Sequence, residues 1–180
     1  MRKVNAFSGI VLLILFLIHA AVGSLQAAGY LPGGNAIMNA LAWALIAVIG
    51  IHAVIGVVLT VQTLTAIRKS GASYFAANRL FWARRLSGFA MLILIVIHTY
   101  IFMGYNNGAF RLRFFGPCQL ICQILLVLTL AVHLTANIRP SLISLGIRSL
   151  KAYAVDILAV LSVVCLVAAG AFVVYFLRWL

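Results

Sequence analysis

Acidic side chains are almost absent from this chain. Asp156 is the single acidic residue among 180, and 13 lysine or arginine residues give a formal net charge of +12. Zinc and copper sites usually draw on carboxylates or thiolates beside histidine, and this chain has few of either to offer. A net charge of this size is found in nucleic-acid-binding proteins, but other proteins carry it too. The positions of the basic residues along the chain therefore have to show which class applies.

Cysteine is also scarce. Cys118, Cys122 and Cys165 form no CxxC or CxxCH motif, so they indicate neither a disulfide framework nor covalent haem attachment. The chain lacks a cysteine cluster for an iron–sulfur centre, and it lacks a glycine-rich dinucleotide fingerprint. We interpret the cysteines as small apolar packing residues, and any haem here would be held noncovalently, as a b-type centre.

Long apolar segments are what the chain has in abundance. Hydrophobic residues make up 66% of it, charged residues 8%, and the mean hydropathy is +1.22, far above the values of soluble domains. A bilayer crossing needs about 20 apolar residues. Five such spans are expected, over 6–28, 38–66, 86–105, 117–137 and 154–177. The sequence therefore predicts an all-α membrane protein, a bundle of five transmembrane helices in one domain over 1–180.

Turn and helix-end residues separate these spans. They are Pro32-Gly33-Gly34, Ser70-Gly71, Asn106-Asn107-Gly108, Gly116-Pro117 and Arg139-Pro140. The fourth span is accordingly expected to end before Pro140.

Basic residues lie almost entirely outside the spans, and they are divided unevenly between the two sides. Ten fall on the side of the N-terminus: Arg2, Lys3, Arg68, Lys69, Arg79, Arg84, Arg85, Arg139, Arg148 and Lys151. Three fall on the other side: Arg111, Arg113 and Arg178. The positive-inside rule then predicts a cytoplasmic N-terminus and an outer C-terminus. The charge encodes topology and offers a docking face for an acidic partner or anionic membrane lipid, so we expect no nucleic-acid binding.

Two segments of the sequence are similar to each other. FSGIVLLILFLIH ends at His19 and LSGFAMLILIVIH ends at His98, 79 residues later, while His133 follows His52 by 81 residues. The repeated unit is a helical hairpin, so the first and third spans run parallel, as do the second and fourth. Equivalent histidines should then lie at similar depths.

Each of the first four spans carries one histidine, and the chain has only these four. A polar side chain inside hydrocarbon is costly and tends to bind something in the bundle interior. A hydrogen bond between helices would explain any single one. Two related pairs favour ligation, and two imidazoles from neighbouring helices around a flat ring are typical of membrane haem proteins.

The Ser-Gly pairs favour a large planar ligand. Ser8 precedes His19 by 11 residues, as Ser87 precedes His98, which is about 20° from the same helical face. We expect Gly9 and Gly88 to leave room for the porphyrin between His19 and His98. The serine hydroxyls would reach a propionate. Packing of helices through small residues is the alternative explanation.

At these residues the chain resembles a known family. The pattern is a Ser-Gly pair, nine apolar positions and a histidine in the first and third spans, with Arg84-Arg85-Leu86-Ser87-Gly88 at the second copy. It resembles the cytochrome b membrane-anchor subunit of succinate dehydrogenase and fumarate reductase, in its single-chain, five-helix, di-haem type. The resemblance implies two haem b groups, with the first four helices around them as two repeated hairpins.

The resemblance also implies how the histidines pair. His19 and His98 would hold the haem far from the cytoplasm, and His52 and His133 the haem near it. His133 lies six residues before Arg139, whereas His52 lies sixteen before Arg68. Helix tilt or extension beyond the bilayer has to absorb that difference.

Arg84 and Arg85 are further candidates for the site. Together with other basic residues near the predicted cytoplasmic face, they would neutralise haem propionates or dock a partner. Solvated loop charge is the alternative for each of them.

The partners follow from the same resemblance. A flavoprotein subunit and an iron–sulfur subunit would bind the cytoplasmic face of a prokaryotic inner membrane, and electrons would pass between them and a quinone, with menaquinone expected. The chain itself would not act on succinate but would be the quinone-reactive subunit, in a complex that can dimerise. Gln26, Tyr30, Asn35 and Asn39 could line an outer quinone site, although loop polarity explains them equally well.

Two other classes stay open. A stand-alone di-haem carrier of the cytochrome b561 kind also uses four histidines on four helices, but it usually has a further helix and needs no soluble partner. A transporter or assembly factor with packing histidines is the alternative without haem.

Overall fold

The computed structural model describes residues 1–34, 36–71, 79–102, 105–106, 109–110, 115–147, 150–178 and 180. The described elements are α1 (Arg2–Ala28), α2 (Ala36–Ser70), α4 (Arg79–Phe102), β1 (Tyr105–Asn106), β2 (Ala109–Phe110), α5 (Pro117–Ser144) and α6 (Leu150–Leu177). The two short strands pair antiparallel between α4 and α5. Among the predicted charged and polar positions, Asn35, Arg111, Arg113 and Arg148 lie outside the described residues.

All five described helices are long and apolar enough to cross a membrane. The prediction of an all-α chain with five membrane-spanning helices is confirmed at that level. Large apolar side chains are exposed along the outside of the bundle, including Phe89, Val96 and Leu166, each more than 60% exposed. Outward apolar side chains suit a bundle whose solvent is lipid.

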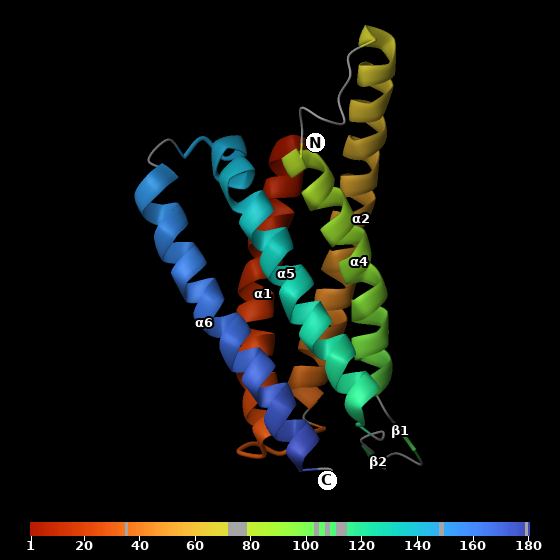
Figure 1. Ribbon diagram of the computed structural model, residues 1–180, viewed down its shortest axis with the longest axis vertical. Helices are drawn as coiled ribbons and strands as arrows, with labels where there is room; N and C mark the ends of the chain where they lie inside the picture. The colour runs from red at the N-terminus through yellow and green to blue at the C-terminus, as the bar shows by residue number, and fades with distance from the viewer. Residues whose placement is uncertain are drawn as a thin grey trace.

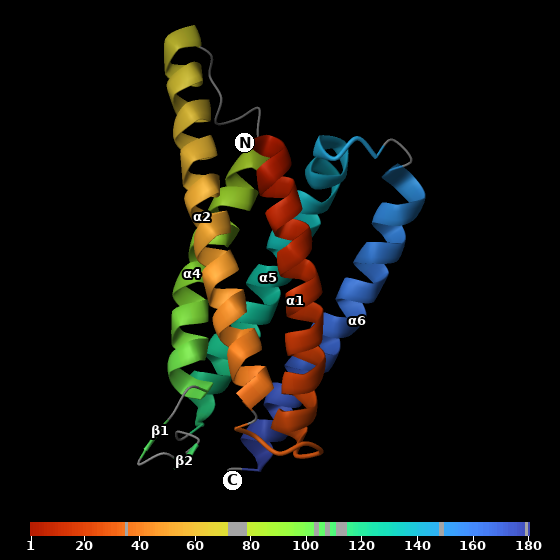
Figure 2. The ribbon, with the colours of Figure 1, turned by 180° about the vertical axis from the view of Figure 1, so that it is seen from behind.

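The helices alternate in direction and form one bundle (Figures 1 and 2). α1 packs against α2, α5 and α6, while α5 also packs against α4 and α6. The N-terminus lies at one end of the bundle, and the C-terminus lies at the other end with the strand pair (Figure 1). We call these the basic end and the hairpin end. The basic end carries Arg2, Lys3, Arg68, Lys69, Arg79, Arg84, Arg85, Arg139 and Lys151.

Glycines end three of the helices. Gly29, Gly71 and Gly146 follow α1, α2 and α5 with φ values of 87°, 67° and 83°, in the left-handed region that favours glycine. At Gly29 a side chain would also collide with the guanidinium of Arg178, which donates a hydrogen bond to the Ala27 carbonyl across 3.2 Å. This contact joins the ends of α1 and α6 at the hairpin end.

The expected helix end at Arg139-Pro140 is wrong. α5 continues through Pro140 to Ser144. Proline removes only its own amide from the helix ladder, and the next turn still closes, because the Leu145 amide donates to the Ser141 carbonyl at 3.1 Å. The last turns of α5 are tilted away from its main axis (Figure 1), as a proline inside a helix commonly causes.

Helix extension accounts for the unequal spacing of His52 and His133 from the basic residues. α2 is 35 residues long and projects beyond the other helices at the basic end (Figure 1). Its last turns, with Arg68 and Lys69, therefore lie outside the bundle. Both histidines can lie at one level although their distances along the chain from the next basic residue differ.

An aromatic cluster closes the bundle at the hairpin end. Ile101, Phe115 and Tyr175 form its buried centre, and Phe115 is fully buried. Phe102 and Phe172 pack against this centre. Since burial of large rings contributes strongly to packing, this end holds α4, α5 and α6 in a fixed relation.

Candidate functional site: a cavity between two histidine pairs

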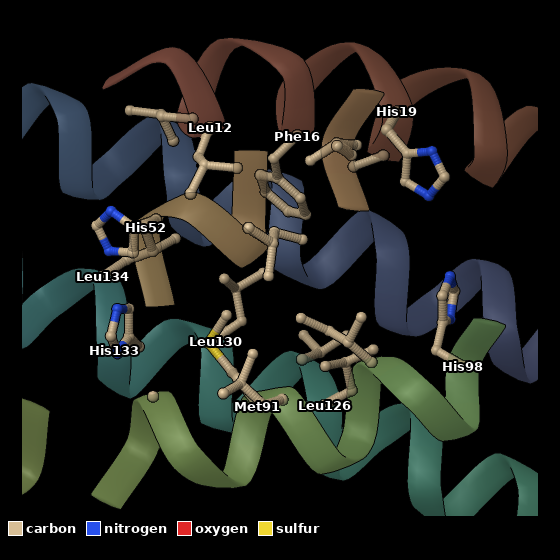
Figure 3. A pocket seen from close by; sticks show the side chains of 18 of the residues that line it. Leu12, Phe16, His19, His52, Met91, His98, Leu126, Leu130, His133 and Leu134 are labelled. Atoms are coloured by element: carbon tan, nitrogen blue, oxygen red, sulfur yellow. The ribbon is translucent and has the colours of Figure 1, made fainter. Parts of the chain in front are cut away.

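A cavity of about 1470 Å³ runs through the bundle and is lined by residues of all five helices. Ligand pockets for drug-sized molecules span about 300–1,000 Å³, so this one exceeds the usual range. Its lining is mainly apolar, and all four histidines reach it. Figure 3 shows His52 and His133 together at one end of the cavity and His19 and His98 at the other.

Apolar side chains separate the two pairs. Leu12, Phe16 and Leu130 lie between them (Figure 3). They come from α1 and α5, the two helices that meet in the middle of the bundle. The cavity therefore has two polar ends and an apolar middle, which would exclude water from the path between the pairs.

The pair at the hairpin end has a measurable geometry. The ring centroids of His19 and His98 are 6.2 Å apart, and the ring planes meet at 75°. Two imidazoles on opposite sides of one metal, each at a bond length of about 2 Å, have ring centres about 6 Å apart. This spacing would allow the two imidazoles to bind one metal ion between them.

His98 is held on several sides. Its Nδ1 lies 2.7 Å from Oε1 of Gln123, whose side chain is fully buried. The rings of Phe102 and Phe172 lie 5.0 and 6.1 Å from its own. An amide oxygen only accepts, so with Oε1 as its partner Nδ1 of His98 would carry the proton and Nε2 would keep its lone pair. His19 differs, because its buried Nδ1 has no hydrogen-bond partner within the described part of the chain.

The pair nearer the basic end is held by serines. Oγ of Ser8 lies 2.8 Å from Nδ1 of His52, and Oγ of Ser87 lies 3.1 Å from Nδ1 of His133. Both serines are buried. The two contacts are equivalent in the sequence repeat, since each joins the Ser-Gly position of one helix to the histidine of the next.

The Ser-Gly pairs lie beside His52 and His133, whereas the sequence predicted that they face His19 and His98. A Cβ on Gly9 would be 3.7 Å from Cε1 of His52, and one on Gly88 would be 3.2 Å from Cε1 of His133. The expectation that these glycines face the His19–His98 pair is therefore wrong. Eleven residues of helix keep the same face but rise about 16 Å, so a shared stripe does not mean a shared level.

Arg84 and Arg85 both line the cavity at its basic end. Arg85 is half-buried, its guanidinium carbon lies 5.2 Å from the ring centre of Phe81, and a Cβ on Gly56 would be 3.9 Å from its Nη1. Its buried Nε has no partner within the described residues, whereas Nε of Arg84 donates to the Leu80 carbonyl at 3.0 Å. Positive charge thus reaches the cavity beside the His52–His133 pair.

Other potential ligands are not gathered at the site. Among the described residues, no three His, Cys, Asp or Glu side chains come together to hold a metal ion by protein ligands alone. Cys118 is exposed, Cys122 is half-buried and Cys165 is buried in the cavity wall, all as free thiols. The donors that the structure does assemble are pairs of imidazoles, which fit a metal whose remaining ligands come from a macrocycle.

Of the polar candidates for a quinone site, Gln26 and Asn39 line the cavity, while Tyr30 is 80% exposed. Sequence reasoning missed Gln123. The signal was available, because an amide in the interior of a predicted apolar span is expected to have a polar partner.

Comparison with known proteins adds no relative. No protein-family model, no curated protein and no solved structure matches this chain.

Proposed function

We propose that this chain is a di-haem cytochrome b of the membrane, in which His19 and His98 hold one haem and His52 and His133 hold the other. The observation that carries the proposal is the arrangement of the only four histidines. They come from four different helices and lie as two pairs at opposite ends of one large apolar cavity, and the ring centres of one pair are 6.2 Å apart.

The donor set supports iron in a porphyrin. When bound, haem supplies one-electron redox chemistry, and the protein supplies orientation and a dry surrounding. Phe16 and its apolar neighbours would make the space between the pairs unfavourable for water. Arg85 and Arg84 would place positive charge near propionates at the basic end, where the unpartnered Nε of Arg85 calls for an anionic acceptor.

The same chain would serve as a membrane anchor. We propose that its basic end faces the cytoplasm and docks a flavoprotein and an iron–sulfur subunit, since nine of the 13 basic residues lie there within the described chain, with Lys151 at the start of α6 among them. Electrons would pass through the two haems to a quinone near the hairpin end, where Gln26 and Asn39 line the cavity. Succinate or fumarate would react only on the soluble partners.

A reduced-minus-oxidised absorption spectrum of the purified chain tests the haem proposal. We expect two b-type components and two haems per chain, and loss of both in a variant with all four histidines replaced by alanine. A wild-type chain that stays free of haem after expression with excess haem would overturn the proposal.

Purification from native membranes tests the anchor separately. Two soluble subunits with flavin and iron–sulfur absorption should copurify. Haem without such partners would instead favour a stand-alone electron carrier.

A further inference from the structure

We propose that Ser8 and Ser87 are positioning residues that fix the ring orientation and protonation of His52 and His133. The inference rests on the proposed function and deepens it, because it says what prepares one of the two histidine pairs for iron. It gives the serines a role toward the ligand histidines, distinct from a contact with a propionate.

Each serine hydroxyl also makes a hydrogen bond to the backbone of its own helix. Oγ of Ser8 donates to the Asn5 carbonyl at 2.9 Å, and Oγ of Ser87 donates to the Ala83 carbonyl at 2.6 Å. Each carbonyl belongs to the serine's own helix, one turn earlier. Each hydroxyl is therefore fixed in direction by the backbone of α1 or α4.

Assigning one proton to each contact says which ring nitrogen is free. A serine hydroxyl has one proton, and we assign it to the carbonyl of the preceding turn, which can only accept, so that Oγ accepts from the imidazole. With that assignment, Nδ1 of His52 and of His133 carries the proton in the contacts of 2.8 and 3.1 Å. Nε2 of each ring is then left with its lone pair, which is the form that binds a metal.

A serine in a helix does not require such a role. Ser162 in α6 donates to the Leu158 carbonyl at 2.8 Å, is exposed, and has no contact with a histidine. Back-bonding to the preceding turn is thus common to several serines of this chain. The contact with a histidine is what distinguishes the two buried serines, and it recurs at the same place in both copies of the sequence repeat.

The adjacent glycines support the same assignment. Gly9 and Gly88 follow the serines directly, and a Cβ on Gly88 would lie 3.2 Å from His133, closer than side chains normally approach. A side chain there would push the ring away from the serine. In each copy the serine thus makes a hydrogen bond to the imidazole ring, and the glycine leaves space for the ring beside it.

Partners of this kind make a ligand histidine more basic and fix its tautomer, and their removal typically lowers metal affinity about 10- to 100-fold. A less basic imidazole also stabilises the ferric state less. We therefore expect Ser8→Ala and Ser87→Ala each to weaken haem binding at the His52–His133 pair by about that factor, and to raise the reduction potential of that component alone.

The experiment uses the full chain in detergent, loaded with haem. Potentiometric titration and electron paramagnetic resonance of the ferric state are recorded for wild type, Ser8→Ala, Ser87→Ala and the double variant. Components are assigned with His133→Ala and His98→Ala. Ser162→Ala is the matched control. Ser87→Thr keeps a hydroxyl at this position and should therefore have the wild-type potential and spectrum. The His19–His98 component reports within each sample that the bundle is folded.

A shift confined to the His52–His133 component, absent in Ser162→Ala and reversed in Ser87→Thr, would support the inference. Unchanged affinity, potential and resonance in the double variant, with two haems bound, would overturn it and leave the proposed function standing. A wild-type chain without haem would overturn both.

Discussion

The two ends of the cavity hold their histidines by different means. At the basic end, His52 and His133 are each in contact with a serine one repeat apart, and the glycine after each serine gives the ring room. At the hairpin end, His98 is fixed by Gln123 and by aromatic rings, while His19 has a buried Nδ1 without a partner in the described chain. One histidine pair thus has equivalent partners and the other does not.

The difference follows from where the repeat is exact. The Ser-Gly pair recurs in both copies, and so does its contact with the histidine of the next helix. The residues of the turn before it differ between the copies. Gln123 has no such counterpart on α2, where the position at the same distance before the histidine is Ala42. The hairpin end therefore depends on α5, α6 and the aromatic cluster rather than on the repeat.

Replacing a histidine should have the largest effect. His98→Ala is expected to remove one haem of two and leave the component of the basic end intact, because the cavity separates the pairs. His133→Ala should do the reverse. Pyridine haemochrome content and difference spectra measure both. If His19→Ala and His52→Ala eliminated the same component, the assignment of pairs would be wrong.

Gly88→Leu should have the next largest effect. It would force the ring of His133 to move and lower haem occupancy at the basic end, at a cost of about 1–3 kcal/mol. Gly9→Leu should cost less, because its added Cβ meets His52 at 3.7 Å rather than 3.2 Å.

Gly170→Leu is the control for both glycine variants, since nothing lies within 4 Å of that position on α6. Haem content resolved by component is the measurement. Loss of the His19–His98 component in the glycine variants would contradict the placement of the Ser-Gly pairs.

Gln123→Leu should act only at the hairpin end. It leaves Nδ1 of His98 buried without an acceptor, which costs about 1–3 kcal/mol, partly offset because the amide nitrogen of Gln123 also lacks a partner now. Thermal unfolding and the spectrum of the His19–His98 component report the change. Equal shifts in both components would show that Gln123 supports the whole bundle instead.

The smallest effect is expected at Arg85. Arg85→Gln removes a positive charge beside the basic-end pair, and that charge favours the reduced state. The reduction potential of this component should fall, by an amount that corresponds to roughly 1 kcal/mol or less of electrostatic energy. Arg139→Gln, exposed and outside the cavity lining, is the control. An equal fall in the control would mean that overall surface charge, rather than the Arg85 side chain, sets the potential.

The sequence alone was sufficient to predict five apolar helices, because the length and hydropathy of each segment are local properties. It also identified the four histidines as a set, since polar groups in apolar spans are few. Helix ends were less predictable. α4 begins at Arg79, seven residues before the expected span, and α5 passes through Pro140, because an amphipathic or charged turn can extend a helix beyond the apolar segment.

Only the tertiary structure decided which residues meet. Helical periodicity placed Ser8 and His19 on one face, but it carries no information on which neighbouring helix lies opposite each turn. The offset between helices brings Ser8 to His52 and Ser87 to His133, while Gln123 reaches His98. Such contacts depend on the relative height and rotation of packed helices, which arise from the summed packing of the whole bundle rather than from any one segment.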